Sequence, residues 1–261
     1  MDTVNIDWML AGVTSAVIFM ASVVHGIAGF GYAQVAMGLL PLFRSPGPAS
    51  VVFTITAVFA NWRVFWSVRE EFAWKDWAAP VAGLIGGLPV GIYVFTGLSD
   101  ALMRLAIGIV LLVSVVFIIA IRQYSFVNRW IKRNDIKPGW KTAIAAGFFG
   151  GVLGGAVAIP GPPMILYGAF MMGAGFWSDT KMKAVLTAFF GTLMLYRLGT
   201  LMVTADVTLS LTIEALIALP ALFLGARVGI WVFNRLPQHI FRWLVLVGLT
   251  VTAALLVIAA F

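Results

Sequence analysis

Ten apolar segments take up most of the chain, and they constrain its fold more than any other feature of the sequence. They lie at about 9–28, 31–43, 49–66, 77–96, 101–121, 141–158, 162–176, 184–202, 208–233 and 240–260. A helix of about 20 apolar residues can cross the hydrocarbon core of a bilayer. Only 10% of the residues are charged, against about 25% in a soluble domain. The sequence therefore predicts an all-α polytopic membrane protein.

Two of these segments are too short to span a bilayer as simple helices. The segments at 31–43 and 162–176 have 13 and 15 residues, and a full crossing needs about 20. Each either crosses the membrane or pairs with the segment before it as a broken or re-entrant hairpin, and the sequence leaves this choice open. In both cases the chain returns to the side from which it started.

Basic residues between the segments predict the orientation in the membrane. Residues 122–141 carry six basic residues and one acidic one, and short loops rich in Lys and Arg stay in the cytoplasm. The net charge of +7 therefore indicates cytoplasmic loops rather than nucleic-acid binding. Counting segments outward from this loop places both termini outside a cytoplasmic (inner) membrane. Arg44 and Arg104 are the two exceptions to this distribution.

The two halves of the chain resemble each other. Residues 87–104 align without gaps with residues 225–242, and glycines and an arginine match as well as aliphatic residues. Each half holds five apolar segments, and duplicated halves with an odd number of segments enter the membrane from opposite sides. Many secondary transporters have such inverted repeats, with a substrate site near the midplane between them. Chance similarity between apolar stretches is the alternative interpretation.

The chain is therefore predicted to form one integral membrane domain with three parts. Residues 1–121 form the first membrane repeat, residues 122–140 a cytoplasmic linker and residues 141–261 the second membrane repeat. Each repeat is predicted to consist of a broken or re-entrant hairpin followed by three transmembrane helices.

Glycine and proline interrupt the apolar sequence at corresponding places in the two halves. The first half contains "HGIAGFGYAQ" and the second "GGAVAIPGPPM". Non-helical backbone at membrane depth is tolerated only inside protein or beside a watery cavity. A helix that starts after such a break directs free N–H groups and the positive end of its dipole at that cavity, where they attract an anion. Close helix packing through glycine is the alternative explanation.

Few charged side chains lie within the apolar segments. An aromatic–Arg pair recurs as Trp62-Arg63 and Tyr196-Arg197. Both arginines either reach the membrane surface or offer planar donors to an oxyanion, with Arg63 toward the cytoplasm and Arg197 toward the outside. Glu214 either carries a coupling proton or meets the dipole and interfacial water at the start of its helix.

No enzymatic motif is present. The sequence contains no Cys and no HExxH, GxSxG or Walker motif, and its two histidines form no motif. We therefore predict a protein that is not an enzyme, with no catalytic residues, no cofactor and no metal site.

Three stretches together resemble the TauE/SafE family of sulfite exporters, also called the 4-toluene sulfonate uptake permease family. They are "GIAGFGYAQVAMGLLPLF", "FANWRVFW" followed by "FAWKDWAAPVAGLIGGLPVG", and "GGVLGGAVAIPGPPMIL". The similarity covers nearly the whole chain, including the duplication. In the first cluster Phe30 and Tyr32 interrupt the run of glycines common in the family, and in the second prolines replace glycines.

The resemblance implies export of a small sulfur oxyanion, with sulfite as the first choice, by alternating access. The alternative is a permease for another organic anion such as an organosulfonate or sulfoacetate, and a membrane enzyme or scaffold has less support. The expected partners are the small anion, membrane lipid and a second copy in a homodimer, but no nucleic acid. The coupling ion and the direction of transport stay open.

Residues around the two breaks and the repeated arginines are the predicted site. The candidate substrate-binding residues are His25, Gly29, Phe30, Gly31, Tyr32, Gln34, Asn61, Arg63, Pro160, Gly161, Pro162, Pro163, Met164, Tyr196 and Arg197. For His25, the alternative is a hydrogen-bonded structural role.

Overall fold

Helices account for all regular secondary structure in the described part of the chain. The computed structural model describes residues 7–28, 30–123, 139–204, 207–233, 250–251 and 253–259. Its elements are α1 (Trp8–Ala28), α2 (Tyr32–Leu39), η1 (Leu40–Leu42), α3 (Pro46–Trp66), η2 (Arg69–Glu71), α4 (Trp74–Gly97), α5 (Asp100–Gln123), α7 (Trp140–Val157), α8 (Gly161–Gly173), α9 (Asp179–Val203) and α10 (Leu209–Phe233). Nine of the ten predicted segments coincide with these helices, whereas the tenth, 240–260, and the linker lie largely outside the described residues.

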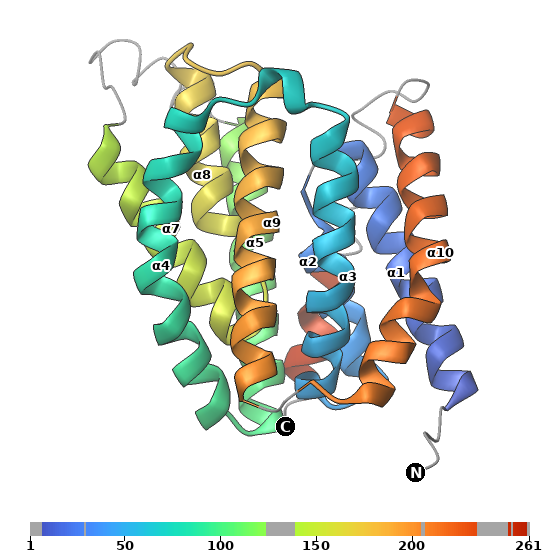
Figure 1. Ribbon diagram of the computed structural model, residues 1–261. Coiled ribbons are helices and arrows are strands. Elements are labelled where there is room, and N and C mark those ends of the chain that lie inside the picture. The colour runs from blue at the N-terminus through green and yellow to red at the C-terminus, as the bar shows by residue number, and fades with distance from the viewer. Residues whose placement is uncertain are drawn as a thin grey trace.

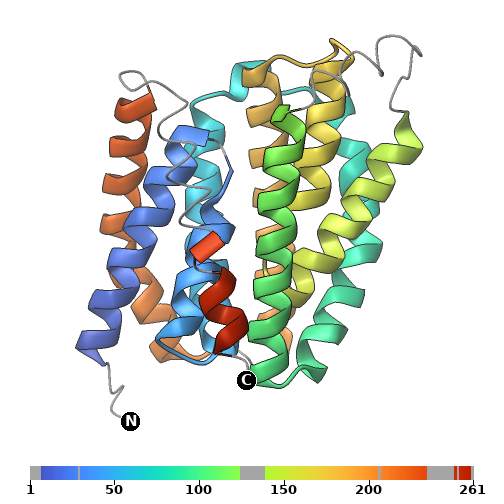
Figure 2. The ribbon, with the colours of Figure 1, turned by 180° about the vertical axis from the view of Figure 1, so that it is seen from behind.

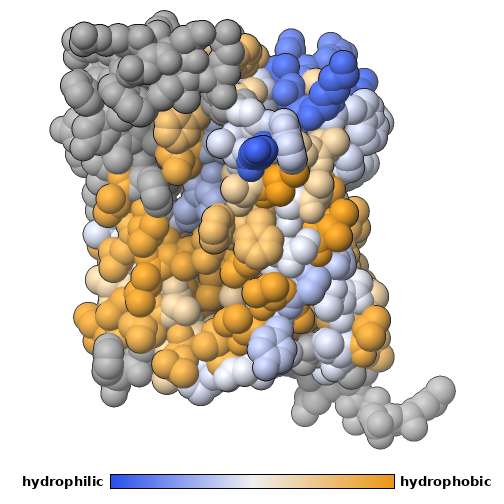
Figure 3. Space-filling view, turned by 90° about the vertical axis from the view of Figure 1, so that its left-hand side faces the viewer, coloured by the Kyte–Doolittle hydropathy of each residue, from blue (hydrophilic) through white to orange (hydrophobic). Residues whose placement is uncertain are grey.

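Long apolar helices confirm the prediction of an all-α polytopic membrane protein. Among the described residues six helices, α1, α3, α4, α7, α9 and α10, are long and apolar enough to cross a membrane. The helices run roughly side by side in one bundle (Figure 1). Large apolar side chains such as Ile85, Val90 and Phe149 are exposed. Figure 3 shows a broad apolar area on one side of the bundle, with hydrophilic residues gathered toward one end. Such a surface suits contact with lipid.

The two short segments do not span the bundle. An α-helix rises about 1.5 Å per residue, so α2, with 8 residues, and α8, with 13, extend about 12 Å and about 20 Å. Both are shorter than the hydrocarbon core of about 30 Å. The chain reverses direction between α1 and α2 and again between α7 and α8 (Figures 1 and 2). Each short helix therefore forms a hairpin with the helix before it.

Left-handed backbone marks both breaks. Gly31, the residue before α2, has φ 95°, and Ala158, the residue after α7, has φ 62°. Glycine adopts this conformation without penalty, whereas an alanine there costs about 1–2 kcal/mol. Pro162 stands in the first turn of α8, where a missing N–H costs no helical hydrogen bond. The chain therefore turns at the breaks and starts a new helix at once.

Glycines bring two pairs of helices into backbone contact. A Cβ atom added at Gly87 or Gly91 of α4 would overlap the carbonyl oxygen of Phe148 or Val152 in α7. A Cβ atom added at Gly225 of α10 would lie 2.5 Å from the carbonyl oxygen of Phe19 in α1. Small residues allow helices in a membrane to approach this closely. Within the two glycine clusters, Gly26 meets the backbone of α10 and Gly155 that of α4 in the same way, so close packing, the alternative weighed for the clusters, accounts for these two glycines.

Candidate functional site

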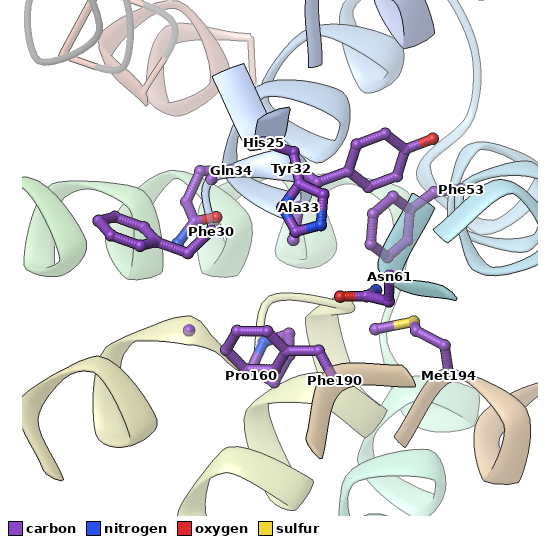
Figure 4. Close-up of a pocket in the computed structure, with 12 residues that line it drawn as sticks. His25, Phe30, Tyr32, Ala33, Gln34, Phe53, Asn61, Pro160, Phe190 and Met194 are labelled. Atoms are coloured by element: carbon purple, nitrogen blue, oxygen red, sulfur yellow. The ribbon is translucent and has the colours of Figure 1, made fainter. Parts of the chain in front are cut away.

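A small, partly enclosed pocket lies where the two breaks meet. Residues from α1, α2, α3, α8 and α9 and from both breaks line it (Figure 4). The lining residues are His25, Phe30, Gly31, Tyr32, Ala33, Gln34, Phe53, Asn61, Pro160, Gly161, Phe190 and Met194. Segments from the two halves of the sequence therefore form one site.

The first turns of α2 and α8 are in contact at this pocket. A Cβ atom added at Gly161, the first residue of α8, would lie 2.5 Å from Nε2 of Gln34 in the first turn of α2. The first N–H groups of a helix have no partner within it, and each helix start carries about half a positive charge. Pro162 and Pro163 have no N–H group, however, so Gly161 is the main backbone donor at the start of α8. The predicted free N–H groups at the start of this helix are therefore fewer than in a helix without these prolines.

Polar atoms of three lining side chains have no hydrogen-bond partner among the described residues. They are both ring nitrogens of His25, Nε2 of Gln34 and Oδ1 of Asn61, and these side chains are only 2%, 2% and 4% exposed. An unpaired polar group in a protein interior costs about 1–3 kcal/mol. Since such groups are rare in native structures and often mark function, these three point to a ligand.

Aromatic and apolar side chains form the rest of the wall. Phe30, Phe53, Phe190 and Met194 line the pocket. The ring of Tyr32 packs beside His25 and Phe53, with ring centroids 5.8 Å and 5.6 Å apart, while its hydroxyl group points away from the pocket (Figure 4). Among the described residues, the lining contains no Lys, Arg, Asp or Glu. The site thus offers uncharged donors, one acceptor and helix starts to a small molecule.

The structure brings eight of the predicted residues together in this lining. They are His25, Phe30, Gly31, Tyr32, Gln34, Asn61, Pro160 and Gly161. Gly29 lies outside the described residues. The sequence analysis missed Ala33, Phe53, Phe190 and Met194, which stand in apolar stretches with nothing to separate them from other core residues.

Five other predicted residues lie outside the lining. Pro162 and Met164 are buried in α8, with Pro163 between them half-buried, whereas Arg63 is half-buried near the end of α3 and Tyr196 is exposed on α9. Their part in substrate binding stays a prediction.

Arg197 is fully buried next to the site. Its guanidinium group donates hydrogen bonds to the carbonyl oxygens of Ser50 (3.3 Å) and Gly155 (3.4 Å) and to Oγ1 of Thr54. It also lies 5.1 Å from the centroid of the Phe95 ring. With 0% exposure, Arg197 does not reach the membrane surface, which removes that alternative. It links α9 to α3 and α7 one turn from the pocket residue Met194.

Glu214 belongs to a separate ionic cluster. Its Oε1 accepts hydrogen bonds from Oγ1 of Thr14 (2.6 Å) and from Nη1 of Arg44 (2.5 Å). Nη2 of Arg104 in turn donates to the carbonyl oxygen of Arg44 at 3.4 Å. The two arginines that departed from the loop-charge pattern therefore form one cluster with Glu214.

We expect Glu214→Gln to lower the free energy of unfolding by about 3 kcal/mol, because it leaves the largely buried Arg44 without its counter-ion. Thermal unfolding of the purified protein measures this loss, and Glu70→Gln on the exposed η2 turn is the control. A variant as stable as the wild type that has lost coupling to a proton gradient would instead favour the predicted proton-carrying role of Glu214.

The comparisons with known proteins agree with this picture. The family model described as sulfite exporter TauE/SafE matches residues 14–256, which is nearly the whole chain. A search of curated proteins and a search of solved structures found no match. Among the described residues, no group of three or more His, Cys, Asp or Glu side chains could hold a metal ion.

Proposed function

The chain belongs to the TauE/SafE family of sulfite exporters, and we propose that it exports a small sulfur oxyanion, with sulfite as the first candidate, across the cytoplasmic membrane. The family is one of transporters and not of enzymes, so the protein is a multi-pass membrane transporter of anions. The observation that carries the proposal is the pocket between the two breaks. There, donors of His25 and Gln34 that have no partner within the described residues face the space in front of two helix starts.

We propose that the halves are inverted repeats that exchange access to this pocket. Gly91 of α4 faces Val152 and Gly155 of α7, and Gly229 of α10 faces Val23 and Gly26 of α1. The two glycines, in α4 and α10, are 138 positions apart in the sequence. The residues that they contact in α7 and α1 are 129 positions apart in both cases. Helices α1 and α7 also run in opposite directions (Figure 1). Both features support two related halves of opposite orientation.

The distribution of basic residues supports an orientation with both termini outside. Arg69, Lys75, Lys181 and Lys183 lie near the end of the bundle formed by η2 and the starts of α4 and α9. Short loops rich in Lys and Arg face the cytoplasm, so we assign this end to the cytoplasmic side. In this orientation Arg63 lies toward the cytoplasm, and Arg197 lies toward the outside.

Arg197 adds positive charge close to the proposed site without lining it. Its hydrogen bonds to Ser50, Thr54 and Gly155 fix the guanidinium group one turn from Met194. In a medium of low dielectric constant such a charge acts over several ångströms. We propose that Arg197 attracts the anion, while Arg63 acts on its path from the cytoplasm.

The apolar wall favours a second candidate substrate. An alkyl or aryl group could pack against the apolar side chains of the lining, which are Phe30, Phe53, Phe190 and Met194. An organosulfonate combines such a group with the same three sulfonate oxygens that the donors would bind. Its export is therefore the second candidate function.

We expect inside-out membrane vesicles that contain the protein to accumulate sulfite faster than vesicles without it. Export from the cytoplasm corresponds to uptake into such vesicles, and labelled sulfite measures it directly. Uptake of organosulfonates without sulfite would select the second candidate. If neither anion accumulates in vesicles that contain folded protein, the proposed function is wrong.

A further inference from the structure

We propose that Asn61 makes the pocket selective for singly charged anions that carry a hydrogen-bond donor, such as hydrogen sulfite, over anions that have acceptors alone. The inference rests on the proposed function, because it assigns the chemical form of the anion bound at the same site. It follows from one side chain whose acceptor faces the pocket.

The position of the Asn61 amide is fixed by its own helix. Its Nδ2 atom donates a hydrogen bond of 2.8 Å to the carbonyl oxygen of Ala57, one turn earlier in α3. In the reverse orientation of the amide, Oδ1 would face the carbonyl oxygen of Ala57. Neither oxygen carries a proton, so this hydrogen bond would be lost. Oδ1 therefore faces the pocket, and Figure 4 shows it pointing into the space beside His25 and above Phe190.

An unpaired acceptor in this place discriminates between anions. Oδ1 of Asn61 is buried and has no hydrogen-bond partner in the described part of the chain, and it carries a partial negative charge. A sulfite dianion offers only acceptors and would repel it, whereas the O–H group of hydrogen sulfite can donate to it. A site with a buried polar group rejects an analogue that leaves this group unpaired.

The charge of the surroundings favours the same form. The described residues of the lining include no Lys or Arg, and the two helix starts supply about half a positive charge each. These match one negative charge. Arg197 lies behind the lining and is held by Ser50, Thr54 and Gly155, so a second charge would leave water without a counter-ion in direct contact, which is expensive in a protein interior. The donors of His25 and Gln34 would then bind the remaining oxygens of the singly charged anion.

The test compares anions of equal charge that differ in the donor. Chlorate has the pyramidal shape of sulfite and a single negative charge but no donor, and in slightly acidic buffer sulfite is mainly hydrogen sulfite. We expect calorimetric titration of the purified full-length protein to show at least about tenfold tighter binding of hydrogen sulfite than of chlorate, the effect of one satisfied buried acceptor. The same preference is expected for 2-hydroxyethanesulfonate over 1-propanesulfonate, which have similar size.

Substitution of Asn61 assigns the preference to its side chain. We expect Asn61→Leu to reduce the preference to less than about twofold, because leucine fills the space without an acceptor. Ser114→Ala is the matched control, since Ser114 makes a similar bond of 2.7 Å to the carbonyl oxygen of Val110 but lies outside the pocket lining. It should keep the preference.

The outcomes separate this inference from the proposed function. Equal binding of the paired anions by the wild type, or a preference that survives in Asn61→Leu, would overturn the role of Asn61 while anion binding stands. If the wild type binds none of the four anions, the proposed function fails and the inference with it. Loss of the preference in Asn61→Leu with binding of chlorate retained supports the proposal, and this retained binding also shows that the variant is folded.

Discussion

Replacing His25 and Gln34 together by leucine is expected to lower sulfite uptake by at least about 100-fold without reducing the yield of folded protein. Hydrogen bonds to a charged group contribute about 1.5–3 kcal/mol each, so loss of one donor weakens binding by about 10-fold to 100-fold. Each single variant should therefore show about a tenfold loss. Uptake by inside-out vesicles, divided by the amount of folded protein, measures the effect.

Folding should survive these substitutions because neither side chain is bonded to the rest of the protein at the atoms concerned. The ring nitrogens of His25 and Nε2 of Gln34 have no hydrogen-bond partner among the described residues. A buried leucine leaves no polar atom unpaired, so the variants should be at least as stable as the wild type. A change that impairs transport but not stability indicates a group reserved for a ligand.

Ser22→Ala provides a control on the same helix. Ser22 is 1% exposed, and its hydroxyl group is also unpaired among the described residues, but it lies one turn before His25 and does not line the pocket. Its replacement should leave uptake unchanged. If the double leucine variant transports sulfite as fast as the wild type, the pocket is not the site through which the anion passes.

Local sequence was sufficient to predict the helices and the breaks. The apolar segments coincide with the helices because a chain in lipid must satisfy its backbone hydrogen bonds within each segment. Gly31 stands where the backbone needs a positive φ, and Pro162 stands where a helix begins. The left-handed residue of the second break is Ala158, however, and an alanine gives no sign in the sequence that its φ is positive.

The pairing of distant helices was not predictable from one sequence. Phe53 and Phe190 line the pocket because α3 and α9 meet there, and nothing near them in the sequence marks this meeting. Arg44 lies 170 residues from Glu214, its ion-pair partner. This ion pair explains why Arg44 departed from the loop-charge pattern, since the pattern considers only charges in loops and not their partners in other helices.

Replacing Gly87 by alanine is expected to prevent stable folding, with a loss of about 3 kcal/mol or more. The added Cβ atom would overlap the carbonyl oxygen of Phe148, and backbone cannot move aside as a flexible side chain can. Helices α4 and α7 would have to separate along the contact and would lose their close packing. In lipid no hydrophobic effect between helices replaces the lost packing energy. The amount of monodisperse protein after detergent extraction, and its unfolding temperature, measure the loss.

Gly86→Ala is the matched control in the next position of α4. The nearest atom to its added Cβ would be Cδ2 of Phe148 at 3.8 Å, an ordinary contact. Since alanine favours a helix over glycine by about 1 kcal/mol, this variant should be as stable as the wild type or more so. Normal folding of Gly87→Ala would show that α4 and α7 are not packed as closely as described.

The same experiment on the other half tests the proposed duplication. Gly229 of α10 meets the carbonyl oxygen of Val23 as Gly91 of α4 meets that of Val152. If the halves are inverted copies of one unit, α4 packs on α7 as α10 packs on α1, and the glycine contacts of both pairs should be equally intolerant of a side chain. We therefore expect Gly229→Ala to match the loss seen for Gly91→Ala. Gly199→Ala should remain folded, because its added Cβ would have no atom of the described residues within 4 Å. A large loss for one glycine and none for the other would contradict the inverted repeat, because equivalent contacts would then carry unequal weight in the two halves.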